Sequence, residues 1–212
     1  MAIVQNPIIG TARKSAGGMV FTRSLDQNVI RAKPITYADR KSDKQLIQRN
    51  RMKATNGLTK ADSKKALDAL YPQRPNKQTR YSRFVQQVIT VVTGLVNGFT
   101  LNFSVLPSMG NGTLPLLATN FSFSDDSGQI EITWTITAPT GSPRLSDKAF
   151  AFLFNERLKT GYSVILASTL SDNSGSFPVP DGWVMQDIVA CYIGFTSNSE
   201  YNSTIAVKAV AN

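Results

Sequence analysis

Basic side chains are crowded into the first 90 residues of this chain of 212. Residues 1–90 hold 18 Lys and Arg against 5 Asp and Glu, a net charge of +13, whereas residues 91–212 hold 5 against 9, a net charge of −4. A single evenly charged domain does not divide in this way. We therefore expect a basic N-terminal half and a mildly acidic C-terminal half that differ in structure.

Residue types that are missing or rare exclude several classes of protein. The chain has no His and only one Cys, Cys191, which excludes a Ser-His-Asp or Cys-His catalytic centre, an intramolecular disulfide and a Cys-rich zinc site. Asp125 and Asp126 stand beside Ser127 and Gly128, a sequence typical of a turn. The sequence thus predicts a non-enzymatic protein with no metal or cofactor, in which Cys191 is a buried apolar residue.

The N-terminal residues show no basic segment followed by a long apolar run, so we expect no signal peptide. The most apolar stretch, residues 84–99, is interrupted by polar side chains and is too short to span a bilayer. We therefore expect no membrane contact and a protein made in a reducing compartment.

Residues 1–41 predict an extended basic arm. Two short β-like runs, 19–23 and 29–33, flank a turn-prone segment at 24–28, which is the pattern of a β-hairpin. An isolated two-stranded hairpin is marginal in water. The arm is therefore expected to pack on another part of the chain or on a neighbouring molecule.

Residues 42–98 predict a helical region. Ser42 followed by Gln45 fits a capping box, with Asn56 and Gly57 as the stop signal, and a second short helix should end before Pro72. Residues 82–96 are ambiguous, because their apolar spacing favours a helix and their β-branched content favours a strand. Their length favours a helix of about four turns.

Residues 99–212 predict an antiparallel β-sandwich of the immunoglobulin-like type. Short alternating runs recur between Gly-, Pro- and Asp-containing turns, and Trp134 is the expected core aromatic. The fold class is therefore α+β, a basic hairpin arm and helices followed by this sandwich. The expected strands are residues 100–105, 118–123, 129–136, 149–154, 162–167, 175–179, 188–195 and 204–210.

The basic N-terminal half is the one candidate functional surface. It admits three interpretations: a nucleic-acid contact, a docking surface for a partner or a sister subunit, and a solvated face. The sequence has no recognised nucleic-acid motif, and an arm with little core of its own favours assembly. The candidate interface or DNA-facing residues are Arg13, Lys14, Arg23, Arg31, Lys33, Arg40, Lys41, Arg49, Arg51 and Lys53.

Short motifs spread over nearly the whole chain resemble those of a known protein family. They are Gly10, Gly17-Gly18, Arg31-Ala32-Lys33-Pro34, Gly128-Gln129-Ile130-Glu131-Ile132-Thr133-Trp134, Ser146-Asp147-Lys148-Ala149 and Tyr192-Ile193-Gly194-Phe195. With them the chain resembles an uncharacterised family that is widespread in Bacteroidota genomes and in phages that infect them, crAss-like phages included. That family has no established catalytic residues.

The resemblance implies a structural component of a bacteriophage virion, assembled in the host cytoplasm. Together with the arm, it points to a head-to-tail connector subunit in the neck or tail. Such a homo-oligomeric ring would contain about a dozen copies and would contact portal, adjacent ring or tail proteins, with nonspecific DNA contact as a further possibility. The alternatives are a capsid decoration or head-fibre anchor protein, and a sequence-nonspecific nucleic-acid-binding protein.

Overall fold

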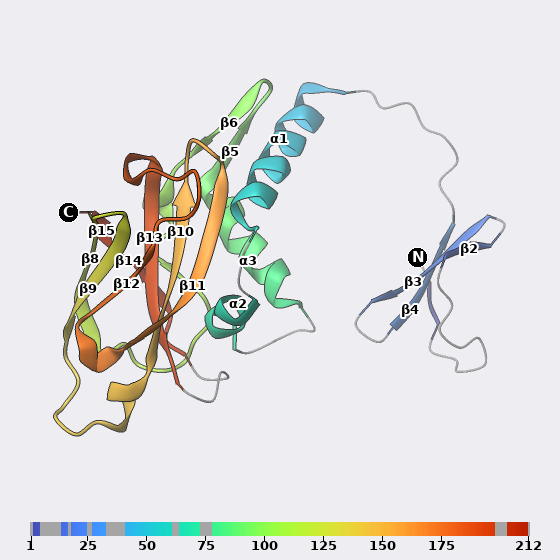
Figure 1. Cartoon of the computed structure of the whole chain (residues 1–212). Helices are drawn as coiled ribbons and strands as arrows, with labels where there is room; N and C mark the ends of the chain where they lie inside the picture. Colours follow the sequence, from blue (N-terminus) through green and yellow to red (C-terminus); the bar gives the residue numbers. More distant parts are fainter. Residues whose placement is uncertain are drawn as a thin grey trace. The chain divides into compact units, whose positions relative to one another are not determined.

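The computed structural model describes residues 2–4, 14–16, 18–24, 27–32, 41–60, 64–72, 78–197 and 203–211. Contacts divide the chain into two compact units, Met1–Lys41 and Ser42–Asn212. The second unit contains the helices (Figure 1), and all of the buried core residues among those described belong to it. Each unit is described by itself.

The N-terminal unit contains one antiparallel sheet in the order β1-β4-β3-β2. The predicted hairpin is confirmed, and its strands extend to a pairing of Ser24 with Gln27, closer to the turn than expected. The two further strands, β1 and β2, have three residues each, too few to show a period-2 pattern. The bounds are β1 (Ala2–Val4), β2 (Lys14–Ala16), β3 (Met19–Ser24) and β4 (Gln27–Ala32).

The C-terminal unit has three layers: helices, a five-stranded sheet and a four-stranded sheet (Figure 1). The five-stranded sheet, in the order β11-β10-β13-β14-β7, comprises β7 (Ser108–Met109), β10 (Lys148–Asn155), β11 (Thr160–Thr169), β13 (Ile188–Thr196) and β14 (Ala206–Lys208). The four-stranded sheet, in the order β12-β9-β8-β15, comprises β8 (Ala118–Asp126), β9 (Gln129–Ile136), β12 (Ser174–Pro178) and β15 (Val210–Ala211).

Strand β10 lies in the middle layer, and its alternating side chains enter two different cores. Phe150, Phe152 and Phe154 belong to the core beneath the helices. Ala149, Ala151 and Leu153 belong to the core between the two sheets. Because successive side chains of a strand point to opposite faces, a strand covered on both faces is apolar throughout.

Three helices cover the outer face of the five-stranded sheet: α1 (Asp43–Leu58), α2 (Lys64–Leu70) and α3 (Arg80–Val88). The predicted capping box is confirmed, since the Ser42 backbone N–H donates to Gln45 Oε1 over 3.1 Å. The ring of Phe84 on α3 meets that of Phe152 edge-on, with centroids 5.3 Å apart. Aromatic contacts of this kind fasten the helical layer to the sheet.

The helix expected over residues 82–96 is only half right. Helix α3 begins earlier and ends at Val88, a 3-10 turn (Ile89–Val91) follows, and the chain then forms β5 (Val92–Leu95), paired with β6 (Gly98–Leu101). β-branched residues from Val91 onward and Gly94 favour extended backbone. The run expected as a strand at 100–105 likewise ends at Leu101 and continues as a 3-10 turn (Phe103–Val105).

The α+β prediction is confirmed, and the expected runs that became β8 to β13 match the structure closely. Trp134 is a core residue, 4% exposed, as predicted. The run at 204–210 is two strands: β14 joins the five-stranded sheet and β15 joins the four-stranded sheet. At the crossover, the Ala209 N–H donates to the Cys191 carbonyl over 2.8 Å.

Candidate interaction surfaces

The ten candidate basic residues fall into separate groups. Three of them lie outside the described residues: Arg13, Lys33 and Arg40. Three others lie on strands of the N-terminal unit: Lys14 on β2, Arg23 on β3 and Arg31, which is exposed, on β4. The remaining four lie at or on helix α1: Lys41, Arg49, Arg51 and Lys53.

Arg51 has a structural contact that the sequence did not reveal. Its Nη2 donates to the carbonyl oxygen of Ile89 over 2.9 Å, and the side chain is partly buried. This bond ties α1 to the backbone that follows α3. Arg51 is thus a residue of the helical packing, which its place in a basic run did not indicate.

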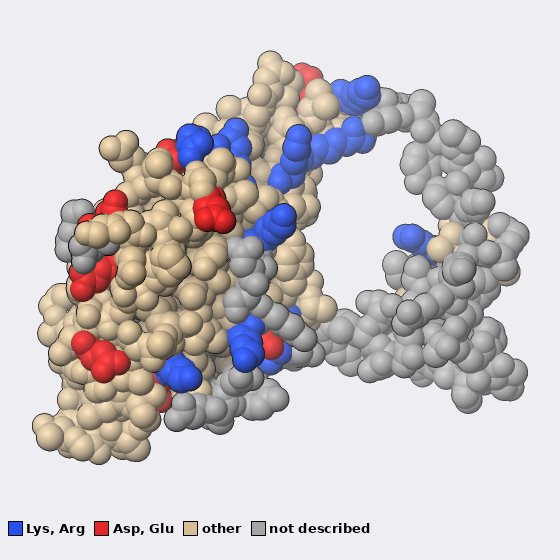
Figure 2. Space-filling model, viewed as in Figure 1, with Lys and Arg blue, Asp and Glu red and all other residues tan. Residues whose placement is uncertain are grey.

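The solvent-exposed side of α1 carries the candidate basic residues that are accessible on the surface. Lys53 and Arg49 are exposed and four residues apart, so they lie on one face, and Lys44 is exposed nearer the start of the helix. Figure 2 shows Lys and Arg side chains gathered along this helix. We call Arg49 and Lys53 the α1 basic face.

A groove of about 520 Å³ runs beside this face, between α1, the β5–β6 hairpin and the turn before β11. Asn50 Nδ2 holds the hairpin by donating to the carbonyls of Leu95 and Val96, each over 2.9 Å. Two lysines and no acid line the groove, and Lys159 Nζ lies 4.6 Å from the centre of the Phe99 ring. This site depends on the β5–β6 hairpin, whose first strand the sequence predicted as helix.

Acidic side chains lie mainly over the sheets. Asp125, Asp172 and Asp181 are exposed, and Glu131 on β9 is partly exposed. In Figure 2 most red side chains lie away from the blue group along α1. The C-terminal unit therefore has a basic helical side and a more acidic side on its β layers.

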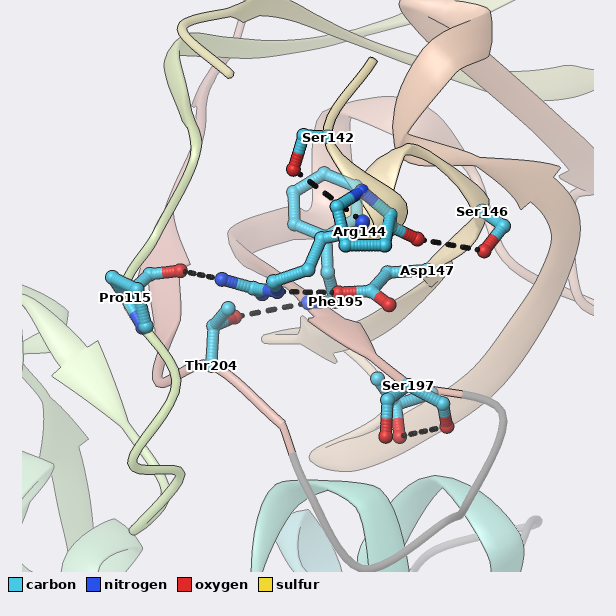
Figure 3. Close-up of polar contacts among 10 residues, drawn as sticks. Pro115, Ser142, Arg144, Ser146, Asp147, Phe195, Ser197 and Thr204 are labelled. Carbon is cyan, nitrogen blue, oxygen red and sulfur yellow. Dashed lines mark hydrogen bonds and ion pairs between the residues drawn. The ribbon is translucent and has the colours of Figure 1, made fainter. Parts of the chain in front are cut away.

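The ion pair of Arg144 and Asp147 is nearly buried, with side-chain exposures of 18% and 5% (Figure 3). Arg144 Nε donates to Asp147 Oδ2 over 2.8 Å, and its Nη1 donates to the carbonyl of Pro115. The backbone carbonyl of Asp147 accepts the Leu170 N–H over 2.8 Å. These contacts join the 3-10 turn (Pro143–Ser146) to two neighbouring segments, which is a structural role.

Burial suppresses the acidity of the groups that could act as nucleophiles. Cys191 is fully buried as predicted, and burial raises the pKa of its thiol far above its ordinary value. Burial also raises the pKa of Tyr71 and of Tyr192. The Tyr71 hydroxyl donates to Gln87 Oε1 over 2.6 Å, so it links the residue after α2 to α3 and has a packing role.

Within the described ranges, no three acidic or Cys side chains gather as a metal site would require. None of the helices in those ranges has both the length and the apolar character needed to cross a membrane.

Comparison with known proteins gives one match. The family described as "Family of unknown function (DUF6266)" matches residues 11–208. No curated protein matches the chain, and no solved structure does. Because the family match includes strands of the N-terminal unit and nearly all of the C-terminal unit, the chain belongs to DUF6266.

Proposed function

We propose that this protein is a non-enzymatic structural subunit that assembles with copies of itself through its N-terminal unit. The observation that carries the proposal is the sheet β1-β4-β3-β2. Wherever the exposure of its side chains is described, none is buried: Met19 is 49% exposed, and Val20, Val29 and Ile30 are only partly buried.

A sheet of this kind needs a second layer to cover its apolar side chains. A neighbouring copy can supply that layer, and head-to-tail contacts repeated around an axis close into a ring. The C-terminal unit has two internal cores, so it keeps its own fold when the N-terminal unit packs elsewhere.

Charge on the C-terminal unit supports the same mode of assembly. The α1 basic face lies on the helical layer, whereas Glu131 and Asp125 lie on the four-stranded sheet. Opposite charges on two sides of one subunit favour heterologous contacts between copies. They also disfavour a symmetric contact that pairs like faces.

The phage setting of the proposal rests on the sequence resemblance. In that setting the subunit belongs to a neck or tail ring of the virion, between portal and tail, with about a dozen copies. Its further partners would then be the portal, adjacent ring or tail proteins. We also propose the immunoglobulin-like type for the two packed sheets, which is supported by their shared core around Trp134.

The non-enzymatic assignment has two positive supports. Cys191, the one thiol, is held protonated by burial. Arg144 and Asp147, the most buried ion pair described, are bound to segments of the fold. These groups stabilise structure and are poorly placed to meet a substrate.

The test compares the full chain with a chain that begins at Ser42, by size-exclusion chromatography with light scattering. We expect the full chain to form an oligomer at high concentration and the shortened chain to remain monomeric. Far-UV circular dichroism on the shortened chain checks that its fold is retained. Monomeric behaviour of both chains at high concentration would contradict the proposal.

A second candidate function is nonspecific nucleic-acid binding, favoured by Lys53 and Lys159 in the groove beside α1. Contacts to phosphates release counterions, so this function predicts steeply salt-dependent binding. Titration of a fluorescent DNA duplex from low to moderate salt separates the two candidates. Absence of binding at moderate salt would exclude the second one.

The capsid decoration alternative differs from a ring in its copy number per particle, which quantitative analysis of purified virions would measure.

A further inference from the structure

A second hollow, of about 490 Å³, opens where the three layers of the C-terminal unit meet. This volume lies within the roughly 300–1,000 Å³ that small-molecule sites occupy. Its lining comes from the residue that follows the C-cap of α1, the start of β11, the end of β12 and the following turn. The lining residues are Lys60, Thr160, Gly161, Tyr162, Pro178, Val179, Pro180, Asp181 and Trp183.

Aromatic rings form one wall of the hollow. Tyr162 and Trp183 meet edge-on with ring centroids 6.2 Å apart. On its other side, Tyr162 stacks on Phe177, at 6.2 Å and 19° between the ring planes. Since Phe177 is buried in the core between the sheets, it fixes the orientation of Tyr162, and Tyr162 in turn supports Trp183.

The turn that carries Asp181 and Trp183 is also held in place. The backbone N–H of Trp183 donates to the Pro180 carbonyl over 3.0 Å, and Gly182 takes a positive φ of 75°. Arg157, from the turn after β10, donates through Nη2 to the Gly182 carbonyl over 2.8 Å. Arg157 Nε also pairs with Asp187 Oδ2 over 2.6 Å, so the turn is fixed from outside.

We propose that this hollow binds a saccharide unit of a glycan. A pyranose ring has apolar C–H faces that pack on an aromatic ring and hydroxyl groups that need donors and acceptors at its rim. Trp183 and Tyr162 supply the aromatic surface. Asp181 supplies an acceptor for hydroxyl groups, and Lys60 supplies a donor.

The charge of the lining favours a neutral ligand. It contains one cation and one anion, Lys60 and Asp181, so its net charge is zero. The groove beside α1 differs in this respect, because two lysines and no acid line it. A nucleic acid or another polyanion therefore suits the groove better than the hollow, and the saccharide assignment does not depend on the proposed function.

The two tryptophans of the chain make the site directly measurable. Trp134 is 4% exposed and its indole N–H donates to the Leu170 carbonyl over 2.9 Å, whereas Trp183 is partly exposed in the hollow. A soluble ligand that changes the emission spectrum or reduces quenching by iodide therefore reports on Trp183. The probes are hexamers of glucose (α-1,4 and β-1,4 linked), mannose, xylose and N-acetylglucosamine, titrated against the full chain.

We expect at least one hexamer to give a saturable change in Trp183 emission. Calorimetry with that hexamer should show that Trp183→Ala weakens its binding about tenfold or more. Asp181→Ala should also weaken it, and Val184→Ala, the exposed neighbour outside the lining, should change it by less than about twofold. Circular dichroism verifies that each variant is folded.

Failure of every hexamer to bind at millimolar concentration would overturn the proposal, as would binding that Trp183→Ala leaves unchanged. A decaproline peptide is titrated in parallel, because aromatic grooves also receive proline-rich segments. Peptide binding that requires Trp183, without binding of any saccharide, would assign the hollow to a peptide and overturn the saccharide assignment.

Discussion

Gly94 on β5 lies directly against the backbone of α1 at Ile47. A Cβ at position 94 would lie 2.3 Å from the Ile47 carbonyl oxygen and 3.1 Å from the Cβ of Arg51. No side chain larger than hydrogen fits at this distance. The close approach fixes the β5–β6 hairpin on the helix and thereby forms one wall of the groove beside α1.

The first prediction follows from this contact. Gly94→Ala should lower the free energy of unfolding by about 1–3 kcal/mol, because the hairpin must move away from α1 to accommodate the methyl group. Urea denaturation followed by circular dichroism measures the change. Thr93→Ala, at the exposed neighbouring position, is the control and should change the free energy by less than about 0.5 kcal/mol.

Arg51 and Lys53 are predicted to behave differently although both stand in the same basic run. Arg51→Ala should lower the free energy of unfolding by about 1–3 kcal/mol, because it removes the charged hydrogen bond to the Ile89 carbonyl, which then keeps only its bond from the Val92 N–H. Lys53→Ala should leave stability unchanged. Equal effects in urea denaturation would contradict the structural role assigned to Arg51.

Local patterns were sufficient to predict most of the β layers. The alternation in 129–136 and the continuous apolar run around 149–154 depend only on whether one or both faces of a strand are covered, so the sequence carries them directly. The start of helix α1 could likewise be predicted from the capping box of Ser42 and Gln45.

The groove and the hollow could not be predicted in the same way, because both form between distant segments. The hollow joins Lys60 to residues more than 90 positions further along the chain, and no local pattern relates them. The β5–β6 hairpin was missed because its position depends on the contact of Gly94 with Ile47. The strands β1 and β2 were missed because three residues show no periodicity.

The ion pair of Arg144 and Asp147 should behave as a coupled unit (Figure 3). Arg144→Ala or Asp147→Ala should each lower the free energy of unfolding by about 3 kcal/mol, because each leaves a nearly buried charge unpaired. The double variant should cost clearly less than the sum of the two. A double-mutant cycle in urea measures the coupling, and additive effects would contradict a direct interaction.

Stability should fall as the pH rises above about 9. Burial raises the pKa of Cys191 and Tyr192 in the folded state above their ordinary values of 9.0 and 10.0. Above those values the unfolded chain releases protons that the folded chain retains, so the stabilisation present at lower pH is progressively lost. Each group adds a slope of up to about 1.4 kcal/mol per pH unit.

Urea denaturation between pH 8 and 10.5 measures this slope in the natural chain and in the double variant Cys191→Ala, Tyr192→Phe. The variant is expected to be less stable overall and to show a shallower decrease with pH. An unchanged slope would show that these two groups do not cause the pH dependence.

Charge reversal tests whether the α1 basic face of one copy meets the β layer of the next. We expect Arg49→Glu with Lys53→Glu to prevent oligomer formation, and Glu131→Lys with Asp125→Lys to prevent it as well, because each places like charges across the contact. Mixing the two variants should restore oligomers in light scattering, because both contacts between unlike variants then join opposite charges. If the mixture stays monomeric while the natural chain assembles, the interface lies elsewhere, and the N-terminal sheet alone must provide it.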